Sequence, residues 1–412
     1  MHMIARTIKK EIIKSIKSKP ITLITGARQV GKSTLCYEIK KECGYNYVSL
    51  DDRRERAQAQ NDPELFLSLH PWPLIIDEVQ YAPVLFDAIE AIVNKEKLEK
   101  GRNEGMYVLT GSQAYELMKG VTESMAGRVS IIRMSPLSAS EIFDKPENKF
   151  EINPLLASKR TADYKVGINE LYSLIVRGMY PELYDKPDCD ANMFYSNYVD
   201  TYIERDVSQL TNLKDKLKFQ NFMEVLASLT GQELVYDTIA KAVEVKVDTI
   251  KSWISILLAG DLVYLLQPYH ESSVVKRVVK RPKLYFSDTG LACYLARLNN
   301  AGVLQHSIFA GRFIETYIVN EIRKSYRNNG IKDNLYYYRD NDQKEIDLVI
   351  LDEGILHFVE CKSGISFTKK DVRSFEKLKG SNYKIGSSAI VCTTGSVYSI
   401  DKDIYALPIT AI

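Results

Sequence analysis

The chain has 412 residues, of which 45% are hydrophobic and 26% charged, a mixture typical of globular proteins and unlike that of disordered or fibrous ones. Its length favours two to three domains over one compact core. With 55 Lys and Arg against 53 Asp and Glu, the net charge of +2 gives no global nucleic-acid signature, so any basic surface must be local.

The cysteines and the apolar segments exclude further classes of protein. The six cysteines form no CxxC pair and have no histidine at zinc spacing, which excludes a disulfide framework or zinc ribbon and favours a reducing compartment. The most apolar stretch, 253–266, is interrupted by Gly260 and Asp261 and is too short to span a membrane. The basic segment 4–19 leads directly into a glycine-rich motif, which leaves no room for a removable presequence. We therefore expect a cytoplasmic protein with no membrane partner.

In the first third, apolar runs typical of strands alternate with helical patterns, which predicts a parallel α/β sheet. The predicted strands of this part are 21–25, 47–50, 74–76, 106–110 and 129–134. The predicted helices are 33–41 and 84–94. A polar stretch with prolines at 144–154 ends the pattern. We therefore predict a first domain at 1–145, followed by a helical linker region at 146–215.

The next segment, 216–298, predicts a winged-helix domain. Its pattern gives three helices at 219–229, 236–243 and 247–258, then strands at 262–266 and 283–286. The third helix would present a polar face made of Lys246, Asp248, Thr249, Lys251, Ser252 and Ser255. The hairpin would form a basic wing on DNA phosphates, with Lys276, Arg277, Lys280, Arg281 and Lys283. Packing against a neighbouring domain is the alternative, and it is slightly favoured because Glu244 and Asp248 oppose contact with DNA.

The last segment, 299–412, returns to α/β character. It predicts a helix at 313–326 and strands at 335–339, 346–351, 356–361 and 388–392.

Residues 26–33 carry the strongest functional signal. They match G-x-x-x-x-G-K-[ST] between a strand and a helix, the arrangement of a phosphate-binding loop. Glycines let the backbone wrap around phosphate oxygens, the ammonium of Lys32 neutralises the β and γ phosphates, and the Ser33 hydroxyl can ligate Mg²⁺. The residues predicted to contact nucleotide are Gly26, Ala27, Arg28, Gln29, Val30, Gly31, Lys32, Ser33, Thr34, Thr110 and Ser112. The expected cofactors are ATP and Mg²⁺.

Two carboxylates complete this site. The apolar run 74–76 is followed by Asp77 and Glu78, as in a Walker B segment. Asp77 is predicted to hold Mg²⁺ together with Ser33, and Glu78 to polarise the attacking water. The run ending at Thr110, Gly111 and Ser112 is either a second polar contact to the γ-phosphate or ordinary turn chemistry.

The order of these motifs resembles the AAA-type ATPases that are joined to a C-terminal region called DUF4143. The matching segments are 25–33, 76–80, 109–112, 124–128, 202–207 and 285–291. The resemblance implies a parallel sheet of order 5-1-4-3-2, with Thr110 or Ser112 at the sensor position, where relatives carry Asn. It also implies that Arg128 stabilises charge near the γ-phosphate, within the subunit or toward a neighbour in a homo-oligomer; an ordinary salt bridge is the alternative for this residue.

The C-terminal segment carries a second, weaker pattern. Asp347, Glu360 and Lys362 on two strands form D…E-x-K, which resembles the PD-(D/E)xK nuclease fold that family members carry here. Asp347 and Glu360 would hold a Mg²⁺ ion, Lys362 would orient water, and Glu315 on the preceding helix would complete the site. A degenerate copy kept as a structural module is the alternative.

These signals predict a Mg-ATP-binding AAA-type ATPase with Lys32, Glu78 and Arg128 as catalytic residues. Hydrolysis would be coupled to movement of the winged-helix and nuclease-like domains, with DNA as a possible partner. Two alternatives stay open: an ATP-gated, metal-dependent nuclease, and a non-catalytic nucleotide-sensing scaffold.

Overall fold

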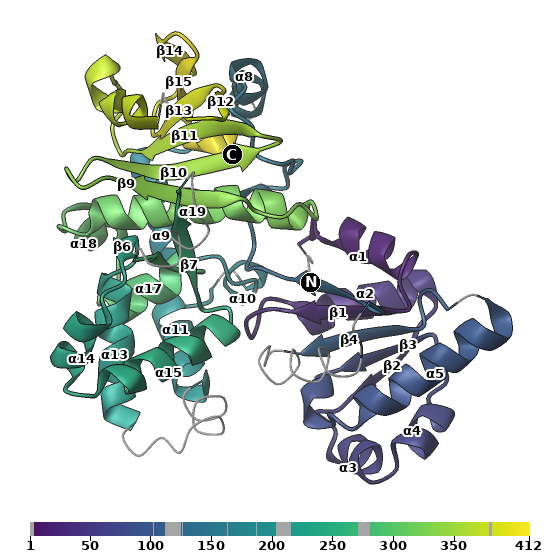
Figure 1. The fold of residues 1–412 in the computed structure, drawn as a ribbon. Helices are drawn as coiled ribbons and strands as arrows, with labels where there is room; N and C mark the ends of the chain where they lie inside the picture. Colours follow the sequence, from purple (N-terminus) through teal and green to yellow (C-terminus); the bar gives the residue numbers. More distant parts are fainter. Residues whose placement is uncertain are drawn as a thin grey trace.

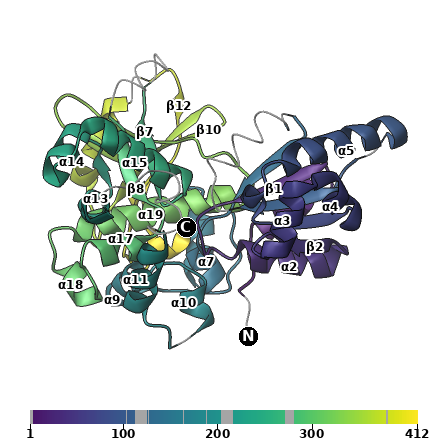
Figure 2. The ribbon, with the colours of Figure 1, turned by 90° about the horizontal axis from the view of Figure 1, so that it is seen from below.

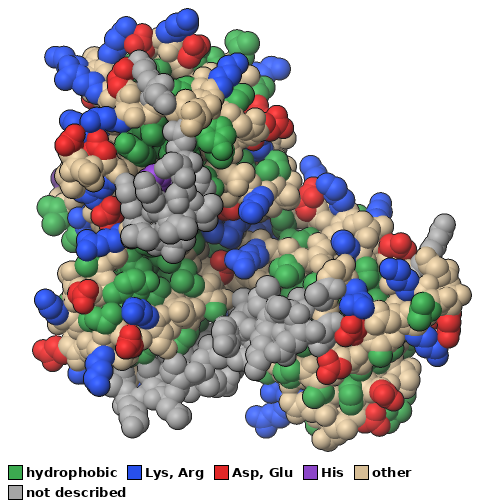
Figure 3. Space-filling model, viewed as in Figure 1, with side chains coloured by type: hydrophobic (Ala, Val, Ile, Leu, Met, Phe, Trp, Pro, Cys, Tyr) green, Lys and Arg blue, Asp and Glu red, His purple; other side chains and the backbone are tan. Residues whose placement is uncertain are grey.

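The computed structural model describes residues 4–101, 103–111, 125, 127–162, 164–186, 188–202, 216–270, 281–378 and 381–412. The chain forms two lobes, and the first contains the purple and blue part of the ribbon (Figure 1). Lys and Arg side chains gather on the surface where the lobes meet (Figure 3). Among the described residues, no helix combines the length and apolar character needed to cross a membrane.

The first lobe is built on a five-stranded parallel sheet. Its strands are β1 (Ile21–Thr25), β2 (Asn46–Ser49), β3 (Leu74–Asp77), β4 (Tyr107–Gly111) and β5 (Val129–Arg133). All neighbouring pairs run parallel in the order β5-β1-β4-β3-β2, so the predicted fold of this part is confirmed. Strands β1, β3 and β4 are buried throughout because helices cover both faces of a parallel sheet.

Local sequence signals account for the helices of this lobe, which are α1 (Lys9–Ile16), α2 (Lys32–Cys43), α3 (Arg53–Asn61), α4 (Pro63–Leu69), the 3₁₀ turn η1 (Val79–Tyr81) and α5 (Leu85–Lys100). The side chains of Asp52 and Asp62 accept backbone N–H bonds at the starts of α3 and α4. Helices α2 and α5 end at Gly44 and Gly101, which have left-handed backbone angles.

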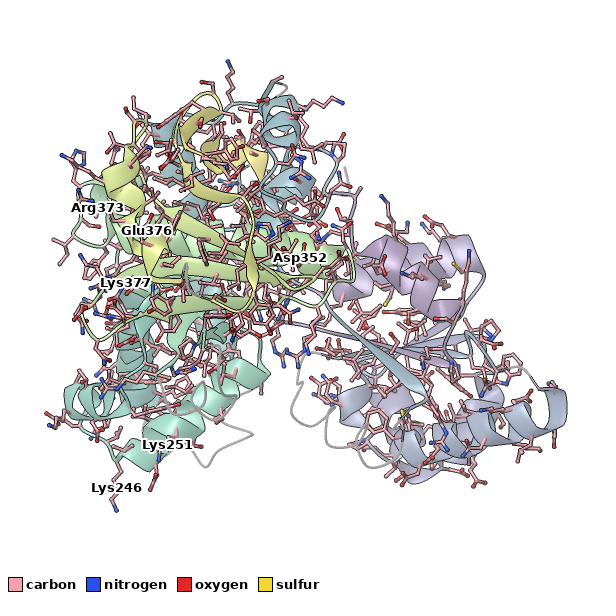
Figure 4. All side chains as sticks on the ribbon, turned by 45° about the horizontal axis from the view of Figure 1, so that its top comes forward. Lys246, Lys251, Asp352, Arg373, Glu376 and Lys377 are labelled. Atoms are coloured by element: carbon pink, nitrogen blue, oxygen red, sulfur yellow. The ribbon has the colours of Figure 1, made fainter. Side chains whose placement is uncertain are left out.

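Helices dominate the first part of the second lobe. They are α7 (Ala139–Ile142), α8 (Pro154–Ala162), α9 (Ile168–Arg177), α10 (Glu182–Asp185), α11 (Ala191–Tyr202), α13 (Lys216–Ser228), α14 (Tyr236–Val243), α15 (Val247–Ala259), α17 (Thr289–Leu295) and α18 (Ala301–Gln305). The three helices predicted for 216–298 are α13, α14 and α15. Figure 4 shows Lys246 and Lys251 projecting outward at the start of α15. The winged-helix identity of this segment stays a prediction.

A ten-stranded sheet runs through the rest of this lobe. It contains β6 (Gln232–Glu233), β7 (Val263–Pro268), β8 (Lys283–Phe286), β9 (Leu335–Arg339), β10 (Glu345–Asp352), β11 (Ile355–Cys361), β12 (Lys384–Ile385), β13 (Ser388–Cys392), β14 (Tyr398–Asp401) and β15 (Ile404–Pro408). Strands β7 and β9 pair in parallel, with Gln267 opposite Tyr336. The sheet is therefore continuous across the boundary predicted at 298/299. The turns η3 (Lys369–Leu378) and η4 (Ile409–Ala411) complete the fold.

Helix α19 (Ala310–Asn328) lies across this sheet and contacts both the helical part of the second lobe and the segment that leaves the first lobe (Figures 1 and 2). Near its start, Thr316 and Thr230 share a hydrogen bond, and Asn320 donates to the Phe286 carbonyl. Nearer its end, the Lys324 ammonium donates to the Leu137 carbonyl, in the segment that leaves the first lobe. Polar side chains buried along α19 therefore join three segments that are far apart in the sequence.

Candidate functional site

The glycine-rich loop lies between β1 and α2, as predicted. Gly31 precedes the first residue of α2 with φ 93°, and Gly26 has φ 142°. A Cβ atom on Gly26 would lie 2.2 Å from the carbonyl oxygen of Met134, which follows β5. The loop therefore needs glycine at position 26 both for its backbone angle and for this close approach.

The side chain of Lys32 is buried inside this loop. Its Nζ donates to the carbonyl oxygens of Gly26 at 3.0 Å and Ala27 at 2.8 Å. Burial lowers the pKa of Lys32, while the nearby carboxylates of Glu78 and Asp77 act in the opposite direction. The ammonium is therefore already held at the centre of the loop and partly stripped of water.

The carboxylates at the end of β3 meet the end of β4, because Ile76 pairs with Leu109 in parallel register. Asp77 accepts hydrogen bonds from the Tyr47 hydroxyl at 2.9 Å and from Thr110 Oγ1. The same Thr110 oxygen accepts the backbone N–H of Glu78 at 3.2 Å. The structure thus brings Thr110 to the Asp77 carboxylate and to the backbone of Glu78. Ser112 lies outside the described residues.

Glu78 itself occupies an unusual backbone conformation. Its φ is 58°, in the left-handed region that non-glycine residues rarely adopt. The Gln80 side chain donates to Glu78 Oε2, which holds the carboxylate. Sequence reasoning gave no role to Gln80 or Tyr47, since only the folded structure shows that they contact Glu78 and Asp77.

Arg6 supports the phosphate loop from outside the motif. Its Nη1 donates to the Val30 carbonyl at 2.6 Å, its Nη2 to the Ser135 carbonyl at 2.7 Å, and its Nε to Glu141 Oε2 at 3.1 Å. Glu141 also completes a capping box with Ser138 at the start of α7. The S-x-x-E spacing was a visible signal for that cap, but nothing local connects it to Arg6.

A cavity of about 560 Å³ opens in front of the loop. From the first lobe it is lined by Arg28, Gln29, Gly31, Lys32, Ser33, Thr34 and Glu78, and from the second by Pro181, Glu182, Asp185, Lys186 and Thr201. The residues predicted to contact phosphate and Mg²⁺ therefore line the same cavity as residues 181–186 of the second lobe, which the sequence analysis did not single out.

Arg128 does not line this cavity. Its Nε donates to Asn94 Oδ1 at 2.8 Å and its Nη1 pairs with Glu90 Oε1 at 2.9 Å, both on α5. Its predicted role at the γ-phosphate stays a prediction, and it would require the side chain to leave α5.

The C-terminal residues Asp347, Glu360 and Lys362 do come together. The register that places Leu348 opposite Val359 continues to place Asp347 opposite Glu360, on one face of the sheet. Lys362 Nζ lies 2.9 Å from Glu360 Oε2 and 3.9 Å from Asp347 Oδ2. Burial and the neighbouring Asp347 raise the pKa of Glu360 to about 8, although Lys362 acts against the shift.

Glu315 contacts Lys283, which the sequence analysis had placed in the basic wing. Its Oε1 accepts from Lys283 Nζ at 2.8 Å and from the Tyr285 hydroxyl at 2.6 Å. Lys283 also pairs with Glu345, and oxygens of Glu315, Glu345 and Asp347 lie within 4.8 Å of one another. Burial raises the pKa of Glu315 to about 7.

Lys283 corrects the prediction of a basic wing. Contact with DNA phosphates was one of two interpretations of this hairpin, and packing within the protein was slightly favoured; Lys283 is 1% exposed and its ammonium is bound by carboxylates of α19 and β10. Lys276, Arg277 and Lys280 lie outside the described residues. Of the wing cations that the structure describes, only Arg281 is exposed to solvent.

Comparison with known families matches three segments of the chain. Residues 18–143 match an AAA domain (AAA_14), residues 168–302 match a domain of unknown function, DUF8612, and residues 310–412 match another, DUF4143. Uncharacterized proteins of Mycobacterium bovis and Mycobacterium tuberculosis are each 24% identical over 352 residues, which is 85% of this chain and 71% of theirs.

Similar solved structures include a Walker-type ATPase of Pyrococcus abyssi and Cdc6p of Pyrobaculum aerophilum. The first is 14% identical with a TM-score of 0.40, covering 70% of this chain and 94% of that one. The second is 12% identical with a TM-score of 0.26, covering 71% and 92%. The five-stranded parallel sheet, the loop at 26–33 and the matched segments together show that the chain contains an AAA-type, phosphate-loop ATPase-like domain at 18–143 and a DUF4143 region at 310–412.

Proposed function

We propose that this protein binds ATP with Mg²⁺ in the cavity at residues 26–34 and hydrolyses it. The observation that carries the proposal is the desolvated ammonium of Lys32, held by two carbonyls of the glycine loop in a cavity that Glu78 also lines. Ammonium and backbone N–H groups at the start of α2 are the donors that a triphosphate requires.

The remaining roles follow from the same geometry. The hydroxyl of Ser33 and the carboxylate of Asp77 are hard oxygen ligands suited to Mg²⁺, which when bound would neutralise phosphate charge. Tyr47 and Thr110 orient the Asp77 carboxylate. Glu78, held by Gln80, takes a proton from the attacking water.

We further propose that nucleotide turnover moves the second lobe. Arg6 bonds the Val30 carbonyl inside the phosphate loop and the Glu141 carboxylate at α7. The adjoining backbone N–H of Ala139 donates to Glu321 on α19 at 2.9 Å. This connected set of hydrogen bonds supports coupling between the loop and α19, because a shift of the loop changes the bonds at both ends.

The test uses two variants of the intact protein. Lys32→Ala removes the phosphate-binding cation and should weaken ATP binding by about 100-fold, equivalent to roughly 3 kcal/mol, whereas Lys40→Ala on the same helix should leave it unchanged. Glu78→Gln should retain ATP binding and lower turnover by about 100-fold or more. Titration calorimetry with ATP and Mg²⁺ and a phosphate-release assay measure both.

The outcomes separate this proposal from a nucleotide-sensing scaffold. A scaffold would bind ATP, show negligible turnover in the parent and respond little to Glu78→Gln. Absence of heat with Mg-ATP in the parent, or a Lys32→Ala variant that binds ATP as the parent does, would refute ATP binding in this cavity.

A second candidate function, ATP-gated metal-dependent cleavage of DNA, is favoured by the convergence of Asp347, Glu360 and Lys362. Carboxylates on paired strands with a lysine beside them are a donor set suited to Mg²⁺ and a scissile phosphate. Cleavage with Mg²⁺ or Mn²⁺ should disappear in Lys362→Ala and persist in Lys369→Ala, which changes an exposed lysine that pairs with Asp401. Equal background cleavage in all three proteins would end the nuclease proposal.

A further inference from the structure

Helix α10 forms the wall of the nucleotide cavity opposite the phosphate loop. Pro181, directly before α10, comes within 3.8 Å of the Cβ position at Gly31, and Glu182 and Asp185 of α10 line the cavity. Helices α10 and α2 lie on facing sides of the two lobes (Figure 2). A ligand held by the loop therefore meets the second lobe first at α10.

Acidic side chains of α10 line the cavity on the side of the second lobe. Glu182 and Asp185 lie there with Lys186, whose ammonium is 2.7 Å from Glu182, while Arg28, Lys32 and Glu78 line the side of the first lobe. Burial and the neighbouring Glu182 raise the pKa of Asp185, as expected for carboxylates crowded at a partly enclosed site. A triphosphate bound by the loop would bring further negative charge into the cavity that Glu182 and Asp185 line.

Helix α10 is fastened to the body of the second lobe. Leu183 is fully buried, and the Tyr184 hydroxyl donates to the Gly178 carbonyl at 2.7 Å. The next residue along, Met179, donates its backbone N–H to Asp288 Oδ2 at 2.7 Å. These two hydrogen bonds, one part-buried and one buried, connect α10 to Asp288 through the short segment 178–179.

Asp288 in turn holds the start of α17. Its Oδ1 accepts the Leu291 N–H at 2.8 Å, as the N-cap of that helix, and the Tyr195 hydroxyl at 2.8 Å. A Cβ on Gly290 would lie 2.6 Å from the Gly178 Cα, so the two backbones are in direct contact. The segment 285–291, which has no role in the proposed nucleotide chemistry, is thus the part of the second lobe that contacts residues 178–179, just before α10.

We propose that α10 is a charge-operated latch: Glu182 and Asp185 oppose entry of the nucleotide phosphates, and their displacement is passed through Met179 and Asp288 to α17. This rests on the proposed binding of ATP in the same cavity. In this proposal the two carboxylates lower the affinity for nucleotide, since nucleotide binding must move α10 away from the loop to relieve the repulsion between carboxylates and phosphates.

The first experiment compares Mg-bound non-hydrolysable ATP analogue affinities by titration calorimetry at low salt. The double variant Glu182→Gln/Asp185→Asn should bind about tenfold more tightly than the parent, and the gain should shrink as salt is raised. The control Glu170→Gln/Asp237→Asn removes the same charge from exposed sites on α9 and α14 and should bind as the parent does. Should the double variant fail to fold, each single variant is expected to give about threefold.

The possible outcomes distinguish the proposed role of α10 from the proposed binding of ATP in the cavity. Equal affinity of the double variant and the parent overturns the latch and leaves ATP binding standing. Weaker binding by the double variant also overturns it, since the carboxylates would then be holding the nucleotide's cation. No binding by any of the proteins refutes ATP binding itself, and the latch with it.

A second measurement tests transmission. Hydrogen–deuterium exchange of residues 289–295 should change when the parent binds the analogue at saturation, and the change should be smaller in the double variant, whose α10 is no longer repelled. Unchanged exchange of this segment in the saturated parent would overturn the path through Asp288.

Discussion

The buried ammonium of Lys283 on β8 allows a quantitative test of how the second lobe is held together. It is 1% exposed, lies 2.8 Å from Glu315 Oε1 on α19, and also pairs with Glu345 on β10. Lys283→Met keeps the length of the side chain and removes its charge. The buried Glu315 and the half-buried Glu345 then lose their shared cation, which costs about 3–5 kcal/mol for a broken buried ion pair.

A matched control is available on α15. The Lys251 ammonium lies 3.4 Å from Asp248, and its side chain is 57% exposed and that of Asp248 92%. Lys251→Met should therefore cost less than about 0.5 kcal/mol, because water and salt screen an exposed pair. The double variant Lys283→Met/Glu315→Gln should recover part of the loss, since it removes the stranded carboxylate as well.

Urea unfolding followed by tryptophan fluorescence provides the assay. The chain has two tryptophans, and a Trp72→Phe background leaves Trp253, which packs against Phe219 and Phe222 in the second lobe, as the reporter. At a slope of about 2 kcal/mol per M urea, Lys283→Met should lower the midpoint by roughly 1.5–2.5 M. A midpoint for Lys283→Met that matches Lys251→Met would show that this ion pair does not hold the lobe together.

Two further predictions concern a glycine and a buried acid. Gly26→Ala places a Cβ 2.2 Å from the Met134 carbonyl oxygen and should abolish ATP binding measured by calorimetry, whereas Gly44→Ala, with open space around its Cβ, should preserve it. Burial raises the pKa of Glu147, which accepts from Asn328, so the folded state keeps a proton that the unfolded chain loses and parent stability falls as pH rises above about 4.5. Glu147→Gln should therefore gain stability relative to the parent as the pH is raised above about 4.5, and parallel pH profiles of urea midpoint would contradict this assignment.

The elements of the phosphate-loop domain were predictable because their signals are local. Short apolar runs between turn residues gave β1, β3 and β4 within a residue or two, and the motif at 26–33 fixed the loop between β1 and α2. The strand order 5-1-4-3-2 came from resemblance to AAA-type proteins and is confirmed by the pairing. Periodicity alone carries no information on which strand lies beside which.

The partners of charged residues were not predictable. Arg6 and Glu141 are 135 positions apart, and their pairing exists only once β1 and β5 are adjacent. Lys283 stood in a run of basic residues that favoured an exposed wing, yet the strand pairs with both β6 and β7 and lies beneath α19. One local signal pointed to the burial of Lys283: side chains alternate between the two faces of a strand, so Lys283 lies on the same face as Tyr285.

The wall of the nucleotide cavity formed by the second lobe was missed for a similar reason. Helix α10 has four residues, too few for any helical periodicity, and its acidic side chains look like an ordinary solvated turn. Their place opposite Lys32 depends on how the two lobes pack. The winged-helix and nuclease-like identities of the later segments, and the catalytic role of Arg128, stay predictions.

The parallel pairing of β7 with β9 has a consequence for dissecting the protein. The segments matched by the two domain families, 168–302 and 310–412, end and begin between these strands, so they suggest a natural place to divide the chain. Severing it there would remove β7 from one side of β9, where Gln267 and Pro268 lie opposite Tyr336 and Tyr337, and would open that side of β9 to self-association. The sheet thus crosses the junction between the two matched segments, and the second lobe should be produced and purified as one piece.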